Sequence, residues 1–86
     1  MYYVYLIKSK KDDLVYTGVT TDLRQRFFDH NHGKSPYTKN HKPYVLAYYE
    51  SYFSKDDAIH RERSLKLRSK AYAQLRNRIK KSLNES

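Results

Sequence analysis

Two short runs rich in tyrosine and branched aliphatic residues open the chain, and a charged segment separates them. The runs cover residues 2–8 and 14–20, and Lys-Lys-Asp-Asp at 10–13 lies between them. Tyrosine, valine and isoleucine suit a pleated, half-buried surface, so two such runs joined by a short polar turn predict a β-hairpin. If the turn centres on its two lysines, Tyr5 and Tyr16 lie opposite one another on one face of that hairpin.

A helix is expected after the hairpin, over residues 22–31. Its first aspartate can accept a hydrogen bond from the backbone of the first turn, Leu23 and Phe27 give it an apolar stripe, and Gly33 is placed to end it. Residues 32–43 follow as a loop that contains both prolines of the chain. A loop of this length is long for a small domain, and such loops are often functional.

A third strand over residues 44–51 and further helix complete the expected fold. Ser-Lys-Asp-Asp at 54–57 is typical of a capping box and predicts a helix start there. Apolar residues then recur at helical spacing, and no Gly or Pro divides them, so one bent helix and two helices are both compatible, with Ser69 as the best breakpoint. We therefore expect an α+β fold over residues 1–82, in which a three-stranded antiparallel sheet packs against two or three helices, and a short tail at 83–86.

The positive charge of the chain is concentrated in its last third. The 86 residues fit a single domain and carry a formal net charge of +9. Between Arg61 and Lys81 there are nine basic residues and one acid, Glu62, which leaves +8 in that segment. A one-sided positive field attracts polyanions, of which nucleic acid is the commonest. The plainer interpretation is a solvated helix face that keeps the protein soluble.

Composition excludes several classes of protein. The chain has no cysteine, so it has neither a disulfide framework nor a thiolate metal site, which fits a reducing compartment. It has no apolar run of about 18 residues that could span a membrane. Its first residues lack the basic region and the cleavage site of a signal peptide. We therefore expect a cytoplasmic protein without a membrane partner, and a monomer.

Glu62 falls on the apolar side of the helix predicted after the third strand. On a helical wheel it lies between Ala58, Leu65 and Ile59. A carboxylate that faces a core needs a cation, because desolvating it unpaired is costly. Two kinds of partner are compatible. One is a salt bridge to Arg26 or to a neighbouring arginine, and the other is a hard metal ion such as Mg²⁺, which keeps most of its waters and needs only one or two protein carboxylates.

Five positions, taken together, resemble the GIY-YIG nuclease superfamily. The residues of that family fall, in order, on two tyrosine motifs, an arginine and a histidine of the first helix, and a later glutamate: Tyr3-Val4-Tyr5, Tyr16-Thr17-Gly18, Arg26, His30 and Glu62. The likeness covers nearly the whole chain. It looks most similar to the small stand-alone bacterial members, which are related to the N-terminal nuclease domain of the excision-repair subunit that makes the 3′ incision.

The resemblance implies hydrolysis of phosphodiester bonds beside one bound metal ion, Mg²⁺ or Mn²⁺. Glu62 would hold the ion, and Arg26 would bind the phosphate through its planar fork of donors. Tyr16 would orient or deprotonate the attacking water, while Tyr5 and His30 would position water and phosphate or share the proton. The base stays open between Tyr16 and His30, because the family favours the tyrosine, whereas an ordinary histidine pKa near 6.5 favours the histidine.

Basic residues outside this set are candidates for contacts with a nucleic-acid backbone. They lie in the loop after the first helix and in the basic C-terminal segment: Lys34, Lys39, Arg61, Arg63, Lys66 and Arg68. Such contacts predict steep salt dependence and little sequence preference. The loop is equally compatible with a plain polar loop, and the exposed tyrosines with stacking on unpaired bases or with filling the core.

The leading functional hypothesis is a divalent-metal-dependent endonuclease that acts on nucleic acid, with DNA favoured as the substrate and DNA repair as the process. One alternative is a nucleic-acid-binding module with weak or no catalysis, whose binding would not depend on a metal ion. The other is an interaction module in a repair assembly, which predicts a stable complex with protein partners.

Overall fold

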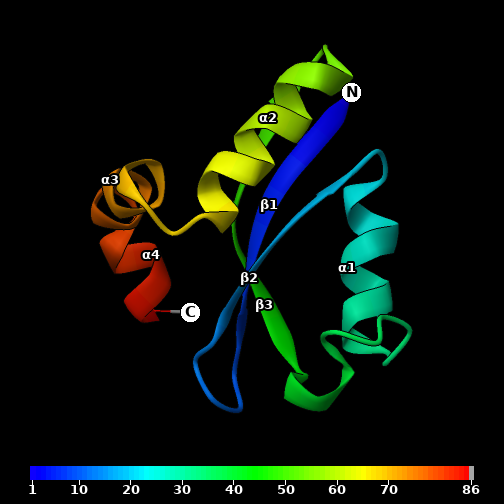
Figure 1. Cartoon of the computed structure of the whole chain (residues 1–86). Helices are drawn as coiled ribbons and strands as arrows, with labels where there is room; N and C mark the ends of the chain where they lie inside the picture. Colours follow the sequence, from blue (N-terminus) through cyan, green and yellow to red (C-terminus); the bar gives the residue numbers. More distant parts are fainter. Residues whose placement is uncertain (86) are drawn as a thin grey trace.

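A three-stranded antiparallel sheet forms the centre of the structure, a computed structural model that describes residues 1–85. Its strands are β1 (Tyr2–Ser9), β2 (Val15–Thr20) and β3 (Tyr44–Tyr52), in the spatial order β2-β1-β3. β1 is central because its hairpin partner β2 pairs with one edge and β3 pairs with the other. Helices lie on both sides of the sheet (Figure 1). The predicted α+β fold class is confirmed.

Helical segments connect and cover the strands: α1 (Leu23–Asn31), the 3₁₀ helix η1 (Lys39–His41), α2 (Lys55–Lys66), α3 (Lys70–Arg78) and α4 (Lys80–Glu85). The caps of the first two α-helices are those predicted. The Asp22 carboxylate accepts a hydrogen bond from the backbone of Gln25, and the Ser54 hydroxyl accepts one from the backbone of Asp57. Gly33 follows α1 with a φ of +72°, which favours glycine. Within residues 1–85, none of the helices combines the length and the apolarity needed to cross a bilayer.

The C-terminal segment is divided into three helices. Arg68 adopts a left-handed φ of +55° after α2, and Ser69 is the N-cap residue of α3, so the predicted breakpoint is confirmed. A second break separates α3 from α4, which adds a helix to the two or three that we expected. Residues 83–85, expected as a tail, belong to α4, and Leu83 is buried. Ser86 lies outside the described residues.

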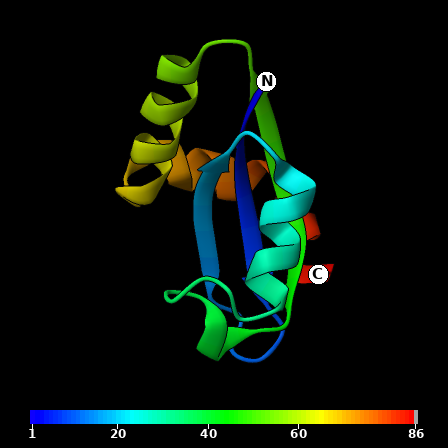
Figure 2. The same cartoon turned by 90° about the vertical axis from the view of Figure 1, so that its right-hand side faces the viewer.

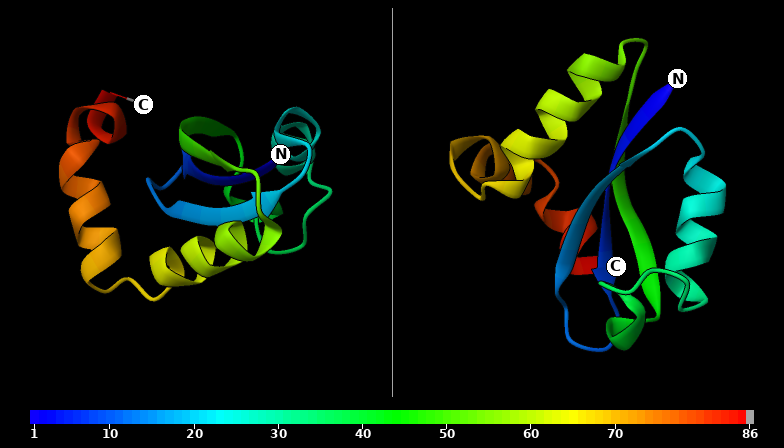
Figure 3. Two further views of the ribbon diagram at one scale, coloured as in Figure 1. Left: turned by 90° about the horizontal axis from the view of Figure 1, so that it is seen from above. Right: turned by 45° about the vertical axis from the view of Figure 1, so that its right-hand side comes forward.

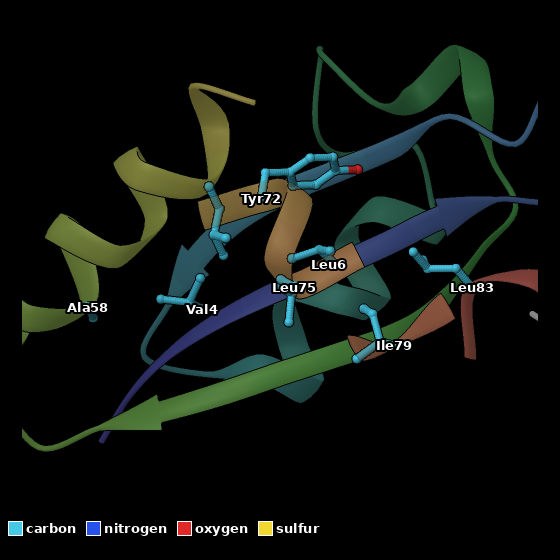
Figure 4. Close-up of a cluster of buried hydrophobic side chains, with 8 residues drawn as sticks. Val4, Leu6, Ala58, Tyr72, Leu75, Ile79 and Leu83 are labelled. Carbon is cyan, nitrogen blue, oxygen red and sulfur yellow. The ribbon is translucent and has the colours of Figure 1, made fainter. Parts of the chain in front are cut away.

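The two faces of the sheet bury two separate clusters of side chains. Helices α2, α3 and α4 cover one face, and α1 covers the other (Figures 1 and 3). The larger cluster, drawn in Figure 4, lies under α2, α3 and α4 and consists of Val4, Leu6, Ala58, Leu65, Tyr72, Leu75, Ile79 and Leu83. The smaller cluster lies under α1 and is built from Tyr5, Ile7 and Tyr44, with Tyr16, Leu23 and Phe27 packed against it. Successive residues of β1 alternate between the clusters because strand side chains alternate between faces.

The pairing register of the hairpin differs by two residues from the predicted register. Tyr5 lies opposite Gly18 and Tyr16 lies opposite Ile7, so the expectation that the two tyrosines directly face each other is wrong. The turn is displaced along the chain because the Ser9 hydroxyl accepts hydrogen bonds from the backbone N–H groups of Lys11 and Asp12. A shift of two residues preserves the face of every side chain, so both tyrosines still lie on one side of the sheet.

The loop over residues 32–43 lies at the same end of the sheet as the β1–β2 turn (Figure 2). Nδ1 of His41 is 2.5 Å from the Asp12 carboxylate, and Nζ of Lys11 donates to the carbonyl of Asn40 at 3.1 Å. These bonds hold the loop against the turn, although the two segments are far apart in the sequence.

Candidate active site

Tyr5, His30 and Thr38 form a buried hydrogen-bonded chain between the central strand, α1 and the loop. The Tyr5 hydroxyl oxygen lies 2.8 Å from His30 Nε2, and the Thr38 hydroxyl oxygen lies 2.7 Å from His30 Nδ1. The histidine is 0% exposed. Both of its ring nitrogens are therefore engaged, and neither is left to bind a water molecule.

Burial keeps His30 and Tyr5 neutral near pH 7. Removing the imidazole from water lowers the pKa of His30 to about 4, and the Arg26 guanidinium adds to this effect. Burial also raises the pKa of the Tyr5 phenol to about 12. A neutral imidazole donates from one nitrogen and accepts at the other, which matches the two hydrogen bonds of this chain.

Gly18 leaves room for the Tyr5 ring. A Cβ atom at residue 18 would lie 2.3 Å from the Tyr5 hydroxyl oxygen and 2.5 Å from its Cζ atom. Non-bonded heavy atoms prefer separations of about 3.5–4.0 Å, so any side chain here would collide with the phenol. Because Gly18 lies directly opposite Tyr5 in the hairpin, a glycine is required at this position.

Tyr16 and Arg26 flank the Tyr5–His30 pair. The centre of the half-buried Tyr16 ring lies 5.2 Å from the centre of the His30 ring. Nη2 of Arg26 donates to the buried Ser35 hydroxyl at 3.3 Å, and the positive charge acts on the pKa of Tyr5 in the direction opposite to burial. A guanidinium has five N–H donors, so this arrangement suits binding of an anion such as phosphate.

Glu62 faces inward from α2, as its place in the apolar stripe predicted. It is 8% exposed and is one of three buried residues of this helix, with Ala58 and Leu65. One alternative for its partner was a salt bridge to an arginine; the structure has a salt bridge, but to Lys66, whose Nζ lies 2.7 Å from Oε2 of Glu62. The same Nζ lies 5.7 Å from the centre of the Tyr16 ring.

The residues with expected catalytic roles come from four elements, β1, β2, α1 and α2, and lie near one another around Tyr5. They are Tyr5, Tyr16, Arg26, His30 and Glu62. Tyr5 is hydrogen-bonded to His30, and the charges of the other three each shift its pKa. The arrangement therefore combines a phenol, a guanidinium and a buried carboxylate around a buried, neutral histidine.

Glu62 is the residue of this set that fits a divalent metal ion. A carboxylate oxygen is a hard ligand of the kind that Mg²⁺ and Mn²⁺ prefer, and Mg²⁺ usually keeps several waters beside one or two carboxylates. Within residues 1–85, no group of three or more His, Cys, Asp and Glu side chains forms a possible metal site. Glu62 would thus be the single protein carboxylate on the ion, and Lys66 would have to leave it.

Glu50, which we did not expect from the sequence to have a role, anchors α2 to the sheet. Two nitrogens of the Arg61 guanidinium each donate to its carboxylate at 2.9 Å, and the hydroxyls of Tyr48 and Tyr52 donate to it as well. Burial acts to raise the pKa of Glu50, but these donors outweigh it and hold that pKa below its usual range. Arg61, expected to contact nucleic acid, is thus engaged within the protein. The available signal was the alternation of Tyr48, Glu50 and Tyr52 along one face of a strand.

The remaining basic candidates differ in their surroundings. Lys34, Lys39 and Arg63 are exposed. The Arg68 guanidinium donates to the backbone of β2 at 2.7 Å and stacks 3.9 Å above the Tyr72 ring, so it is held against the protein. The exposed lysines and Arg63 are therefore the better placed for contacts with a polyanion.

A small pocket opens beside Tyr16. Its volume is about 160 Å³, and its lining includes Leu14, Tyr16, Tyr37, His41 and Tyr44. A larger groove of about 510 Å³ lies between α1 and β3, and none of the five expected catalytic residues lines it. The smaller pocket is the one that adjoins the candidate site, because Tyr16 belongs to both.

Comparison with known proteins gives a consistent result. The GIY-YIG catalytic domain family matches residues 1–81. A UPF0213 protein of Staphylococcus haemolyticus is 46% identical over 66 residues, which are 76% of this chain and 79% of that protein. A UPF0213 protein of Halobacterium salinarum is 40% identical over 83% of this chain and 92% of its own length. The solution NMR structure of a UPF0213 protein from Bacillus halodurans is similar with a TM-score of 0.54 and 34% identity, over 87% of this chain and 81% of that one.

Proposed function

The chain belongs to the GIY-YIG catalytic domain family, and from this premise we propose that it is a divalent-metal-dependent endonuclease that hydrolyses phosphodiester bonds, with DNA as the substrate. The observation that carries the proposal is the convergence of Tyr16, Arg26 and the buried Glu62 around Tyr5. In this proposal Tyr16 orients the attacking water, Arg26 binds the phosphate and Glu62 is the ligand of a metal ion. The positive charge of the chain supports a polyanionic substrate.

Tyr16 is the residue that we assign to the attacking water. His30 is a poor base here because it is fully buried, both of its nitrogens are engaged and burial lowers its pKa to about 4. Tyr5 is also unsuited, since burial raises the pKa of its phenol to about 12. Tyr16, by contrast, is only half-buried, and the Lys66 ammonium lies over its ring.

Arg26 and Glu62 take the charge of the reacting phosphate in this proposal. The Arg26 guanidinium binds the non-bridging oxygens and stabilises the extra negative charge that develops as water attacks phosphorus. Glu62 would hold Mg²⁺ or Mn²⁺, which when bound supplies positive charge at the scissile phosphate and the leaving oxygen. His30 and Tyr5 act through position: their hydrogen bond fixes α1, and with it Arg26, against the sheet.

Cleavage assays on supercoiled, branched and single-stranded DNA, and on RNA, in Mg²⁺ or Mn²⁺ test this function. We expect the wild type to cut DNA, and Glu62→Gln, Arg26→Ala and Tyr16→Phe each to lose on the order of 100-fold or more in rate. The exposed Glu85 supplies a matched control, because Glu85→Gln changes the same charge away from the site. A Glu62→Gln variant as active as wild type, or a wild type inactive in both metals, contradicts the proposal.

One observation favours a second candidate, a nucleic-acid-binding module without catalysis. Lys66 already neutralises Glu62, so the carboxylate is not left as an unpaired buried charge. A binding module of this kind holds DNA with a steep salt dependence that neither Mg²⁺ nor Glu62→Gln alters. Nitrocellulose filter binding with and without Mg²⁺ distinguishes the two candidates, since the endonuclease loses metal-dependent binding in Glu62→Gln.

A further inference from the structure

We propose that the pocket beside Tyr16 holds an unpaired nucleobase of the strand being cut, and that Tyr37 is its stacking surface. The inference rests on the proposed function and narrows its substrate to nucleic acid with a base free to leave the stack next to the scissile phosphate. It assigns a role to an aromatic side chain that has no part in the catalytic set.

The exposure of Tyr37 is the first observation. This side chain is 84% exposed, in a chain whose other tyrosines are mostly packed into the sheet. A single exposed aromatic ring is ordinary on a flexible segment. Tyr37, however, lies between two residues that are almost fully buried, Ser35 and Thr38, at 1% exposure each.

The anchoring of the loop is the second observation. The Ser35 hydroxyl accepts a hydrogen bond from Arg26, and the Thr38 hydroxyl is bonded to His30. The Tyr44 hydroxyl donates to the Thr38 carbonyl at 3.1 Å. The segment that carries Tyr37 is thus fastened at both ends, and two of its anchors are residues of the candidate site. A ring held outward in this way loses little conformational entropy when a ligand stacks on it.

The size and lining of the pocket suit one base. Its volume of about 160 Å³ is well below the range of about 300–1,000 Å³ that is usual for whole drug-sized ligands, so a single ring system fits better than a complete nucleotide. Leu14 and the rings of Tyr37 and Tyr44 provide flat apolar surface, and stacking on such rings is open to every base. His41 adds a polar edge.

The charge around the pocket favours a nucleic acid over an apolar peptide. The turn and the loop that meet at this end carry five lysines, Lys10, Lys11, Lys34, Lys39 and Lys42. Their two aspartates are both paired, Asp12 with His41 and Asp13 with Lys8. Phosphates on either side of a stacked base are attracted to such a rim. Tyr16 lines the pocket as well, so a base held there places its own phosphate beside the residue that we assign to the attacking water.

Binding without metal tests this inference separately from cleavage. The probes are three oligonucleotides that carry 2-aminopurine: a single strand, a duplex with one bulged 2-aminopurine, and the fully paired duplex. In EDTA we expect Tyr37→Ala to weaken binding of the first two by about fivefold to 100-fold and to abolish the fluorescence change of the bulged base, with duplex affinity unchanged. Tyr37→Phe keeps the ring and is expected to behave as wild type.

Phe53→Ala is the matched control. Phe53 is 91% exposed and follows the opposite end of β3 from Tyr44, so its removal deletes an equally exposed ring away from the pocket. The inference is overturned if Tyr37→Ala binds all three probes as Phe53→Ala does, or if it loses the single strand and the duplex equally. If the wild type shows the expected binding pattern but does not cleave DNA, the proposed function is contradicted and the base-binding pocket is still supported.

Discussion

Lys66 places its ammonium nitrogen 2.7 Å from the carboxylate of Glu62, one turn earlier on α2. The glutamate side chain is 11% exposed and the lysine side chain 50% exposed, so the lysine reaches from solvent to a carboxylate that the fold has buried. The hydrogen bond to Glu62, together with the negative charge of that carboxylate, raises the pKa of Lys66. The protein therefore supplies its own cation at the position where the proposed chemistry places a metal ion, and the two cations must compete for one carboxylate.

Replacing Lys66 by methionine is expected to strengthen the binding of Mn²⁺ to the protein. The stem of the side chain is kept, but the competing charge is gone. Because the pair is partly exposed, we expect a gain of only about fivefold in affinity. Electron paramagnetic resonance of free Mn²⁺ measures it, with Lys70→Met as a control on an exposed lysine. Equal or weaker binding by Lys66→Met contradicts the competition.

A methyl group at residue 18 is expected to destabilise the fold through Tyr5. Gly18→Ala puts Cβ within 2.3 Å of the Tyr5 hydroxyl oxygen, so the phenol must move, at a cost of about 1–3 kcal/mol in the free energy of unfolding. Tyr5→Ala removes the obstacle, so Gly18→Ala should cost much less in that background. Urea unfolding of the two single variants and the double variant checks this, and additive losses would show that the two residues do not meet.

Acid is expected to destabilise the protein through His30. Its pKa is lowered to about 4 in the fold, against about 6.5 in the unfolded chain, so the unfolded state binds more protons between these values. Stability therefore falls as pH falls through this window, by about 2 kcal/mol between pH 7 and pH 5. His30→Gln has no such group, and its unfolding free energy should depend less on pH by this amount. Parallel pH profiles of the two proteins would refute the prediction.

Thr17→Val is expected to stabilise the protein. Among residues 1–85, the Thr17 hydroxyl is the one buried side-chain oxygen or nitrogen without a hydrogen-bond partner, and valine has nearly the same shape. Removing an unsatisfied buried hydroxyl should raise the free energy of unfolding by about 1 kcal/mol. Thr17→Ser, which keeps the hydroxyl, is the control. A Thr17→Val variant less stable than wild type would contradict the prediction, because it would show that the hydroxyl stabilises the fold.

Local signals in the sequence predicted the elements of the fold well. The caps at Asp22 and Ser54, the glycine after α1 and the break at Ser69 all depend on a few neighbouring residues, and each is found where expected. The inward face of Glu62 also followed from helical spacing alone. Such features are set by backbone geometry over one or two turns, so they are readable without the tertiary structure.

Features that depend on distant contacts were not predictable in the same way. The predicted hairpin register was wrong by two residues because hydrogen bonds to the Ser9 hydroxyl determine the position of the turn. The choice of Lys66 as the partner of Glu62, and of Glu50 as the partner of Arg61, depends on which side chains the packed helix brings within reach. The exposed position of Tyr37 likewise follows from two anchors in the loop that bond to α1.

The most direct test of the proposed active site is anomalous X-ray diffraction from crystals of the protein grown with Mn²⁺ and a short DNA strand whose phosphodiesters resist hydrolysis. We expect an anomalous peak about 2.0–2.3 Å from an oxygen of Glu62, with Lys66 displaced from that carboxylate and Arg26 on the phosphate that the ion also contacts. If Glu62 is still paired with Lys66 and no Mn²⁺ lies beside it while DNA is bound, the metal-dependent endonuclease is contradicted.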